Sequence, residues 1–172
     1  MRLKAMAKIN LGLDVLGKRE DGYHEVRMIM QTIRMYDILD IRKTRRPGIV
    51  LTTNLPFIPT DQRTLVYKAA QMLMDKFDDE EGLSIKLRKF IPVAAGMAGG
   101  SSDAAAAFVG VNRMFHLGLT EEQLMERAVK VGADVPYCIM RGTALAEGIG
   151  EKLTRLPEVP KCYVLIGKPG IN

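Results

Sequence analysis

The stretch PVAAGMAGGSSDAAAA, residues 92–107, decides how this chain is interpreted. Gly96, Gly99 and Gly100 leave the backbone free of side chains where a ligand would have to approach closely. Two serines follow, and then an aspartate and a run of alanines that favours a helix. The N-terminus of a helix offers unpaired N–H groups and a positive partial charge, so a glycine-rich loop leading into it predicts an anion site.

The loop matches neither of two familiar phosphate-binding motifs. The sequence contains no GxxxxGKS/T, and no GxGxxG after the pattern of a parallel strand. Glycine motifs are often accidental, and a flexible loop capped by serine explains these residues about as well as an anion site does. The rest of the chain therefore has to decide between an anion site and a plain loop.

Composition narrows the class of protein. The 172 residues fit one domain, and 47% hydrophobic with 26% charged residues is typical of a globular protein. Lys4 and Lys8 interrupt the N-terminus too early for a signal peptide, and no apolar run is long enough for a membrane helix. Cys138 and Cys162 are too few for a disulfide framework, so we expect buried thiols in a cytoplasmic protein that binds no membrane. The net charge of +5 favours anionic partners, which include nucleotides and nucleic acids.

Hydrophobic periodicity predicts an α+β fold with helices on one face of a sheet. Residues 5–15 alternate with period two, which predicts a strand with one buried face. Further strands are predicted at 25–33, 36–42, 48–53, 83–91, 137–146 and 162–167. Helices are predicted at 64–77, with Leu65, Ala69, Leu73 and Phe77 on one stripe, at 102–115, and after 120–123. The last begins at the capping box TEEQ.

Two candidate polar residues lie in unusual places. Lys8 lies beside Asn10 on the second face of the first strand, and Asp134 lies between small and apolar residues in GADVP, 132–136. A lysine on a strand is usually solvated, and an aspartate before a proline is usually a turn or cap residue. Neither residue defines a site by itself.

Taken together, four segments resemble the GHMP kinase superfamily. They are AKINLGLDVLGKREDGYHEV (7–26), the glycine-rich stretch 92–107, GADVP (132–136) and GTALAEGIGE (142–151). The resemblance runs in the right order over essentially the whole chain. It implies a ribosomal-protein-S5-domain-2-like α+β fold, with ATP and Mg²⁺ as cofactors. DGYHEV and GADVP are most similar to the members that phosphorylate the 2-hydroxyl of a cytidine-diphosphate-linked methylerythritol in the non-mevalonate isoprenoid pathway.

The resemblance also implies roles for individual residues. Asp134 would accept the hydroxyl proton, Lys8 would pair with Asp134, and Asn10 would bind near the accepting hydroxyl. Tyr23 would stack on the cytosine and His24 would hydrogen-bond to it, although without the resemblance an exposed aromatic at the start of a strand is the better explanation of both. The residues implied to contact ATP are Pro92, Val93, Ala94, Ala95, Gly96, Met97, Ala98, Gly99, Gly100, Ser101, Ser102 and, near the adenine, Lys89. Ser101 and Ser102 would also face Mg²⁺.

The sequence departs from the family pattern in two places. Thr64 stands where family members often have asparagine. Family members also continue past Lys168 and Pro169 into a second domain. We therefore interpret residues 1–172 as the N-terminal, ATP-binding domain, with the C-terminal domain absent and with weak or no activity on its own.

Three alternatives stay open. The chain could be another small-molecule kinase of the superfamily, which DGYHEV disfavours. It could be a basic nucleic-acid-binding domain of S5-like fold, which the absence of tryptophan and of alternating aromatic and basic residues disfavours, so we expect no nucleic acid. It could also be an inactive fragment that only dimerises; a homodimer is compatible with every interpretation.

Overall fold

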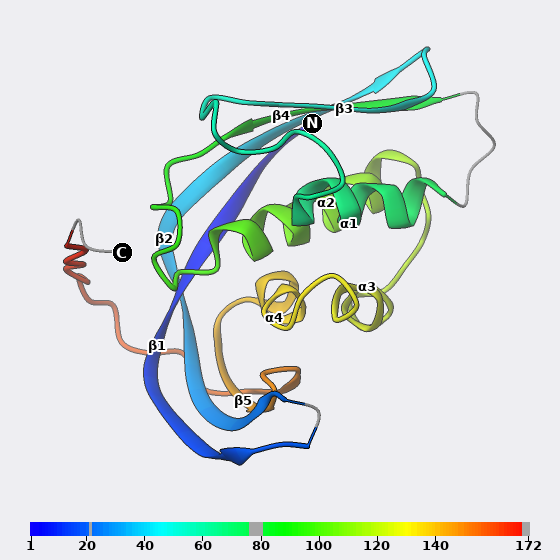
Figure 1. The fold of residues 1–172 in the computed structure, drawn as a ribbon. Coiled ribbons are helices and arrows are strands. Elements are labelled where there is room, and N and C mark those ends of the chain that lie inside the picture. Colours follow the sequence, from blue (N-terminus) through cyan, green and yellow to red (C-terminus); the bar gives the residue numbers. More distant parts are fainter. Residues whose placement is uncertain (21, 76–80, 170–172) are drawn as a thin grey trace.

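The computed structural model describes residues 1–20, 22–75 and 81–169, and within them the fold is α+β, as predicted. The strands are β1 (Arg2–Lys18), β2 (His24–Thr44), β3 (Gly48–Thr53), β4 (Gly82–Arg88), β5 (Thr143–Gly148) and β6 (Lys152–Arg155). The helices are α1 (Leu65–Met74), α2 (Gly99–Met114), α3 (Glu121–Ala128) and α4 (Val135–Met140). Figure 1 shows the helices gathered on one side of the long, curved ribbon formed by β1 and β2.

Strand β2 is the centre of a six-stranded sheet with the order β3-β4-β2-β5-β6, and β1 pairs with β2. β1 runs antiparallel along one edge of β2. The other edge is shared, because β5 pairs with residues 26–31 and β4 with residues 38–44. Residues 32–37 lie between these two partners, and this gap in the pairing positions the site described below. β3 and β4 are parallel and are connected through α1.

The prediction of two strands at 25–33 and 36–42 is wrong, because β2 is one continuous strand. The intervening residues contain no glycine or proline, so nothing in the backbone requires a break there.

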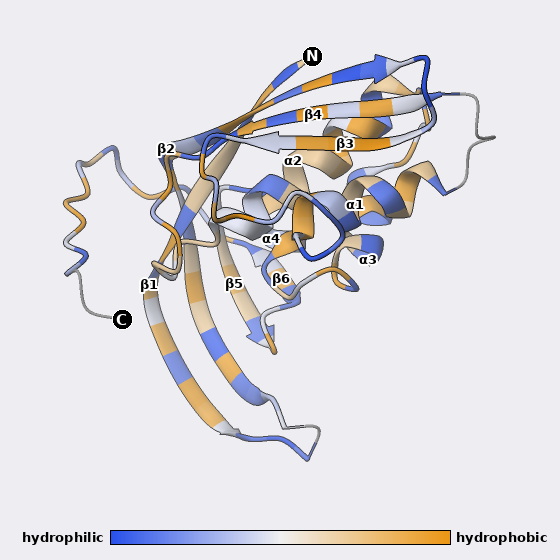
Figure 2. Cartoon of the chain, turned by 45° about the horizontal axis from the view of Figure 1, so that its top comes forward, coloured by the Kyte–Doolittle hydropathy of each residue, from blue (hydrophilic) through white to orange (hydrophobic). Residues whose placement is uncertain are grey.

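β1 has two halves that differ in burial. Ala5 and Ala7 are buried, but Leu11, Leu13 and Val15 are 49–59% exposed. The prediction of one buried face over residues 5–15 is therefore wrong for the second half. A register shift between Met6 and Lys8 also interrupts the alternation, so that the neighbours Ala7 and Lys8 are both buried. Figure 2 shows the alternating polar and apolar bands that continue along this strand into its exposed half.

The predicted helices are present with shifted ends. On α1, Ala69 and Leu73 are buried, Leu65 is half-buried, and Phe77 lies outside the described residues. α2 begins at Gly99, three residues before the predicted start. The capping box of α3 is confirmed, since Gln123 N–H donates to the Thr120 hydroxyl and Thr120 N–H donates to the Gln123 side chain.

Three predictions for the C-terminal third are wrong. Residues 135–140 form α4, so the strand predicted at 137–146 begins only at Thr143. Residues 162–167 form no strand, because this segment pairs with no neighbouring strand and Tyr163 and Leu165 are fully exposed; the extended residues lie earlier, in β6. Cys138 is buried as predicted, but Cys162 lies on the exposed segment.

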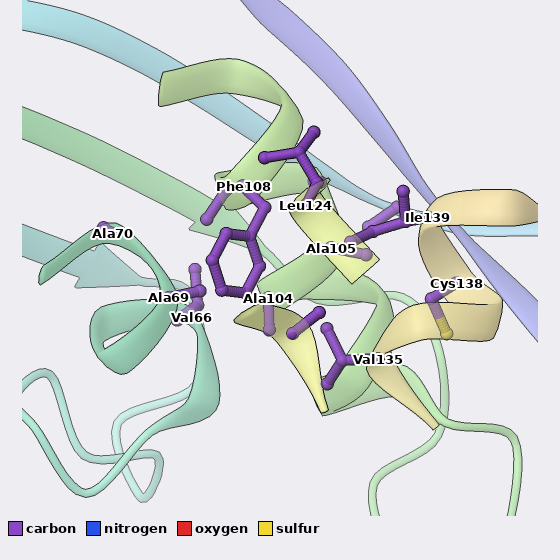
Figure 3. Close-up of a cluster of buried hydrophobic side chains, with 14 of the residues drawn as sticks. Val66, Ala69, Ala70, Ala104, Ala105, Phe108, Leu124, Val135, Cys138 and Ile139 are labelled. Carbon is purple, nitrogen blue, oxygen red and sulfur yellow. The ribbon is translucent and has the colours of Figure 1, made fainter. Parts of the chain in front are cut away.

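The main core lies between the sheet and the helices. Figure 3 shows the ring of Phe108 of α2 beside Val66 and Ala69 of α1, with Leu124 of α3 close by. α2 packs tightly on the sheet at Gly110, where a Cβ would come within 2.6 Å of the Ile41 and Leu3 side chains. In the described part of the chain, no helix is both long and apolar enough to span a membrane.

Candidate active site

The glycine-rich loop lies between the end of β4 and the start of α2, and it lines a cavity of about 770 Å³. Residues 92–101 all line this cavity. Lys8 and Asn10 reach it from β1, and Asp134 reaches it from the turn before α4. The fold thus brings three segments that are far apart in the sequence to one hollow. A second hollow of about 530 Å³, lined by Tyr67, Lys68 and Lys130 among others, contains none of the predicted site residues.

Lys8 and Asp134 form an ion pair across the cavity, with Nζ and Oδ2 3.6 Å apart. This confirms the prediction that the two side chains meet. The Lys8 side chain is 6% exposed, and its ammonium also donates to Asn10 Oδ1 at 3.1 Å. A buried ammonium needs such partners, because desolvation is costly for an unpaired charge.

Asp134 is not a conventional helix cap. It occupies the N-cap position of α4, yet its side chain accepts no hydrogen bond from that helix. The carboxylate faces Lys8 and the cavity, and its side chain is 31% exposed. The simpler explanation of this residue, a cap or turn aspartate, therefore does not describe its contacts. It remains accessible to a bound molecule.

The loop backbone is shaped to receive an anion. Ala94, Gly96 and Ala98 have φ values of +55°, +69° and +54°, so left-handed residues alternate along it. Backbone turns of mixed handedness direct consecutive N–H groups into one concavity, the arrangement found in anion-binding nests. No side chain caps the N-terminus of α2, whose first residues Gly99 and Gly100 line the cavity. The 16-residue helix adds its positive end to the same place.

The two serines of the loop differ in position. Ser101 lines the cavity. Ser102 is 1% exposed, and its hydroxyl donates to the Met6 carbonyl of β1. Its placement therefore disagrees with the expectation that Ser102 contacts ATP and Mg²⁺, because its hydroxyl already bridges α2 to β1.

Lys89 lies at the cavity wall, but its ammonium is already paired. Its Nζ donates to Asp37 and to Asp103, the latter at 2.7 Å, and the residue is 8% exposed. Its backbone is held by the Asn54 side chain, which accepts from Lys89 N–H and donates to Lys89 C=O. The expected contact of Lys89 with adenine could not use this ammonium without breaking the cluster.

Within the cluster of Asp37, Lys89 and Asp103, the pKa values of Lys89 and Asp103 are shifted. Burial raises the pKa of Asp103 to about 8, although the nearby Lys89 charge opposes this rise. Burial lowers the pKa of Lys89, but Asp103 and Asp37 outweigh it and the net pKa is raised. Lys89 thus stays charged near neutral pH while Asp103 binds a proton readily.

Sequence reasoning missed Asp37 and the role of Asp103. Asp37 has the same strand phase as the buried Leu39 and Ile41, which was a detectable sign of an inward-facing carboxylate. Asp103 opens a run of alanines on a helix that is buried on most of its faces. A charged residue in such surroundings requires a buried partner.

The remaining predicted residues lie elsewhere or act differently. Tyr23 and His24 are exposed at the start of β2 and are not among the residues that line the cavity. Their roles in cytidine binding stay predictions. Thr64 lines the cavity, but its hydroxyl donates to the Asp61 carbonyl and does not cap α1.

Comparison with known proteins identifies the class of protein to which this fold and site correspond. Residues 64–142 match the family described as GHMP kinases N terminal domain. A solved 4-(cytidine 5'-diphospho)-2C-methyl-D-erythritol kinase has a TM-score of 0.77 at 34% identity, covering 91% of this chain and 55% of that protein. The mevalonate kinase of Methanococcus jannaschii has a TM-score of 0.68 at 16% identity, covering 91% of this chain and 56% of that one, which shows a shared fold alone.

Residues 64–142 match the N-terminal domain of GHMP kinases, and the fold around them is the ribosomal-protein-S5-like fold of that domain. Over its whole length it is similar to proteins named 4-diphosphocytidyl-2-C-methyl-D-erythritol kinase. The relative from Lachnospira eligens is 57% identical over 172 residues, which is 100% of this chain and 60% of the relative. The relative from Lachnoclostridium phytofermentans is 58% identical over 170 residues, or 99% of this chain and 58% of the relative. The chain thus spans about 60% of the length of these relatives.

Proposed function

We propose that this site transfers the γ-phosphate of ATP to the 2-hydroxyl of 4-diphosphocytidyl-2-C-methyl-D-erythritol. The observation that carries the proposal is the Lys8–Asp134 pair, which lies at 3.6 Å in the same cavity as the glycine-rich loop. The names of the relatives supply the acceptor.

The chemistry divides between the loop and the ion pair. The loop and the N-terminus of α2 would hold the phosphates through backbone N–H groups. The acceptor oxygen would attack the γ-phosphorus, the bond to the β,γ-bridging oxygen would break, and ADP would leave. Asp134 would orient the hydroxyl and take its proton, while Lys8 would offset charge that develops on the transferred group. Positioning and electrostatics supply most of the catalysis in such transfers.

Mg²⁺ fits the oxygen atoms at this site. It usually keeps several waters and binds through one or two protein oxygens together with phosphates. Ser101 and Asp134 both line the cavity and could supply such oxygens. When bound, the ion would neutralise charge on the phosphates. In the described residues no cluster of three or more histidine, cysteine or carboxylate groups offers a self-sufficient metal site.

Several finer expectations remain part of the proposal. Residues 1–172 would act as an ATP-binding domain with weak activity on their own, in the cytoplasm, without nucleic acid or membrane as partners. A homodimer is compatible with this proposal. ADP release would be measured with the proposed acceptor and, in parallel, with mevalonate and homoserine, which separates this kinase from other members of the superfamily.

The test of the catalytic pair is Asp134→Asn. The amide keeps the shape of the side chain but cannot take a proton, so turnover should fall by about 10²–10⁴-fold. ATP affinity, measured by titration calorimetry, should change little, because the loop is intact. Asp14→Asn is the matched control, since Asp14 lies on the exposed half of β1 and does not line the cavity. Equal turnover of the Asp134→Asn and unsubstituted proteins would refute the assignment.

A further inference from the structure

The cluster of Asp37, Lys89 and Asp103 lies where the glycine-rich loop is anchored, and we call it the loop clamp. Its side chains come from β2, from the residue after β4 and from α2. The three residues are 0%, 8% and 3% exposed, so solvent barely reaches the contacts between them. Both Lys89 and Asp103 also line the cavity.

The clamp holds the entry to the loop through Asp37. One carboxylate oxygen, Oδ1, accepts the backbone N–H groups of Phe90 and Ile91, the latter at 2.8 Å. These are the last two residues before Pro92. Asp37 lies in the gap between the strand partners of β2, so its side chain replaces the ladder bonds that a strand would make there.

The clamp holds the exit of the loop through Lys89. Its ammonium bridges the second oxygen of Asp37 to Asp103, in the second turn of α2. The contact is close, because a Cβ on Gly99 would lie 3.2 Å from Lys89 Nζ. The two ends of the loop are thus joined through one ammonium. Independent ties from Lys8 N–H to Met97 C=O and from Ser102 to Met6 fix the exit against β1.

Stability alone does not explain a buried charged cluster. Replacing buried ion pairs by apolar residues of similar volume is often neutral or stabilising, so such groups need another reason to be present. Here the location of the cluster suggests the reason, because its contacts hold both ends of the glycine-rich loop. A loop that binds through backbone N–H groups depends on its shape, and preorganisation raises affinity by lowering the entropy lost on binding.

We propose that the loop clamp is a positioning device that sets the affinity of the glycine-rich loop for the phosphates of a nucleotide. Asp37, Lys89 and Asp103 act through the loop and do not themselves contact the ligand. The proposal rests on the proposed function, because it assumes that the loop binds ATP.

The test is Asp37→Asn, which preserves the volume of the side chain. The amide has only one oxygen, so it can accept either the N–H groups of Phe90 and Ile91 or the Lys89 ammonium, but not both sets. The dissociation constant for ATP and the KM for ATP should both rise about tenfold or more, because small displacements of a binding loop are costly. The KM for the acceptor should stay unchanged. Backbone amides of residues 93–98 should exchange hydrogen faster. Asp103→Leu, which cuts only the tie to α2, should act in the same direction and serves if Asp37→Asn does not fold.

Two controls separate positioning from general destabilisation. Asp40→Asn removes a carboxylate from the same strand, one that pairs with Arg2 and Arg88 on the outer side, and should leave ATP affinity unchanged. Leu73→Ala weakens the core at α1 without touching the loop, and should lower the melting temperature but not the affinity. If Asp37→Asn behaves like Leu73→Ala, the clamp is merely structural and the proposal is wrong. If the unsubstituted chain does not bind ATP, the proposed function fails and the clamp proposal fails with it.

Discussion

Gly99 and Gly100 are adjacent in the first turn of α2, yet their surroundings differ. A Cβ on Gly99 would meet Ile91 Cγ2 and Lys89 Nζ, both at 3.2 Å. A Cβ on Gly100 would meet only Leu65 Cδ1 at 3.8 Å, an ordinary contact. A Cβ at Gly99 would therefore press on the loop clamp, whereas a Cβ at Gly100 would not.

This contrast predicts opposite effects of two alanine substitutions. Gly100→Ala should raise the free energy of unfolding by up to about 1 kcal/mol, because alanine is the better helix former. Gly99→Ala should gain nothing or lose stability, and should weaken ATP binding as it presses on Lys89. Urea denaturation and ATP titration of both variants check this. Identical behaviour of the two would show that Gly99 is not in contact with the clamp.

Individual site residues were predictable to different degrees. Lys8 and Asp134 are far apart in the sequence, and each alone looks like an ordinary strand or turn residue; only the resemblance to a family joined them. The loop was predictable from its glycines, because the requirement there is local. The pairing of Asp37 with Lys89 was not, because it depends on the gap between β4 and β5 along β2.

Helix α3 shows how far a local signal can define an element. Its N-terminus is fixed by reciprocal bonds between Thr120 and Gln123, with Glu121 and Glu122 in the first turn where the helix dipole favours them. Thr120→Ala should lower the free energy of unfolding by about 1 kcal/mol. ATP affinity should not change, since this end of α3 does not line the cavity.

The comparison variant for this prediction is Gln123→Ala. It removes the side-chain half of the box but keeps the bond from the residue 123 N–H to the Thr120 hydroxyl, so its effect should be smaller. Urea midpoints of the two variants give the order. A larger effect for Gln123→Ala would contradict the assigned cap.

Elements without a local start signal were misread. Residues 135–140, VPYCIM, are all buried, so no polar face shows a helical period, and several of them favour strands. Pro136 in the first turn of α4 was the available evidence for a helix. The sequence pattern predicts two strands where the structure has the single strand β2. The strand is continuous, and only its partner changes, from β5 to β4. Neither the burial of α4 on all sides nor the change of strand partner along β2 can be read from a short window of sequence.

At the scale of the whole molecule, stability should be distributed unevenly along the β1–β2 ribbon. The first half of β1 lies under α2 and carries the buried Ala5, Ala7 and Lys8. Beyond Asn10 every residue of β1 is exposed, and its strand pairing is with β2 alone. Two of the three register shifts of β1, between Asn10 and Gly12 and between Val15 and Gly17, interrupt the pairing in this exposed half. The site thus rests on the well-packed half of the sheet, and the exposed half extends away from it (Figure 1).

Hydrogen exchange measures this difference directly. Amides of β4, whose Leu83, Ile85 and Leu87 are buried, should exchange only on global unfolding. Amides of residues 11–18 that bond to β2 should exchange by local opening of the ribbon end. Because a domain is stabilised by about 5–15 kcal/mol and local opening requires a fraction of this, the two rates should differ by more than about two orders of magnitude. Leu13→Ser should therefore leave the urea midpoint nearly unchanged, whereas Ile85→Ala, which truncates a buried side chain of β4, should lower it strongly. Uniform protection along residues 2–18 would show instead that the ribbon unfolds only with the core.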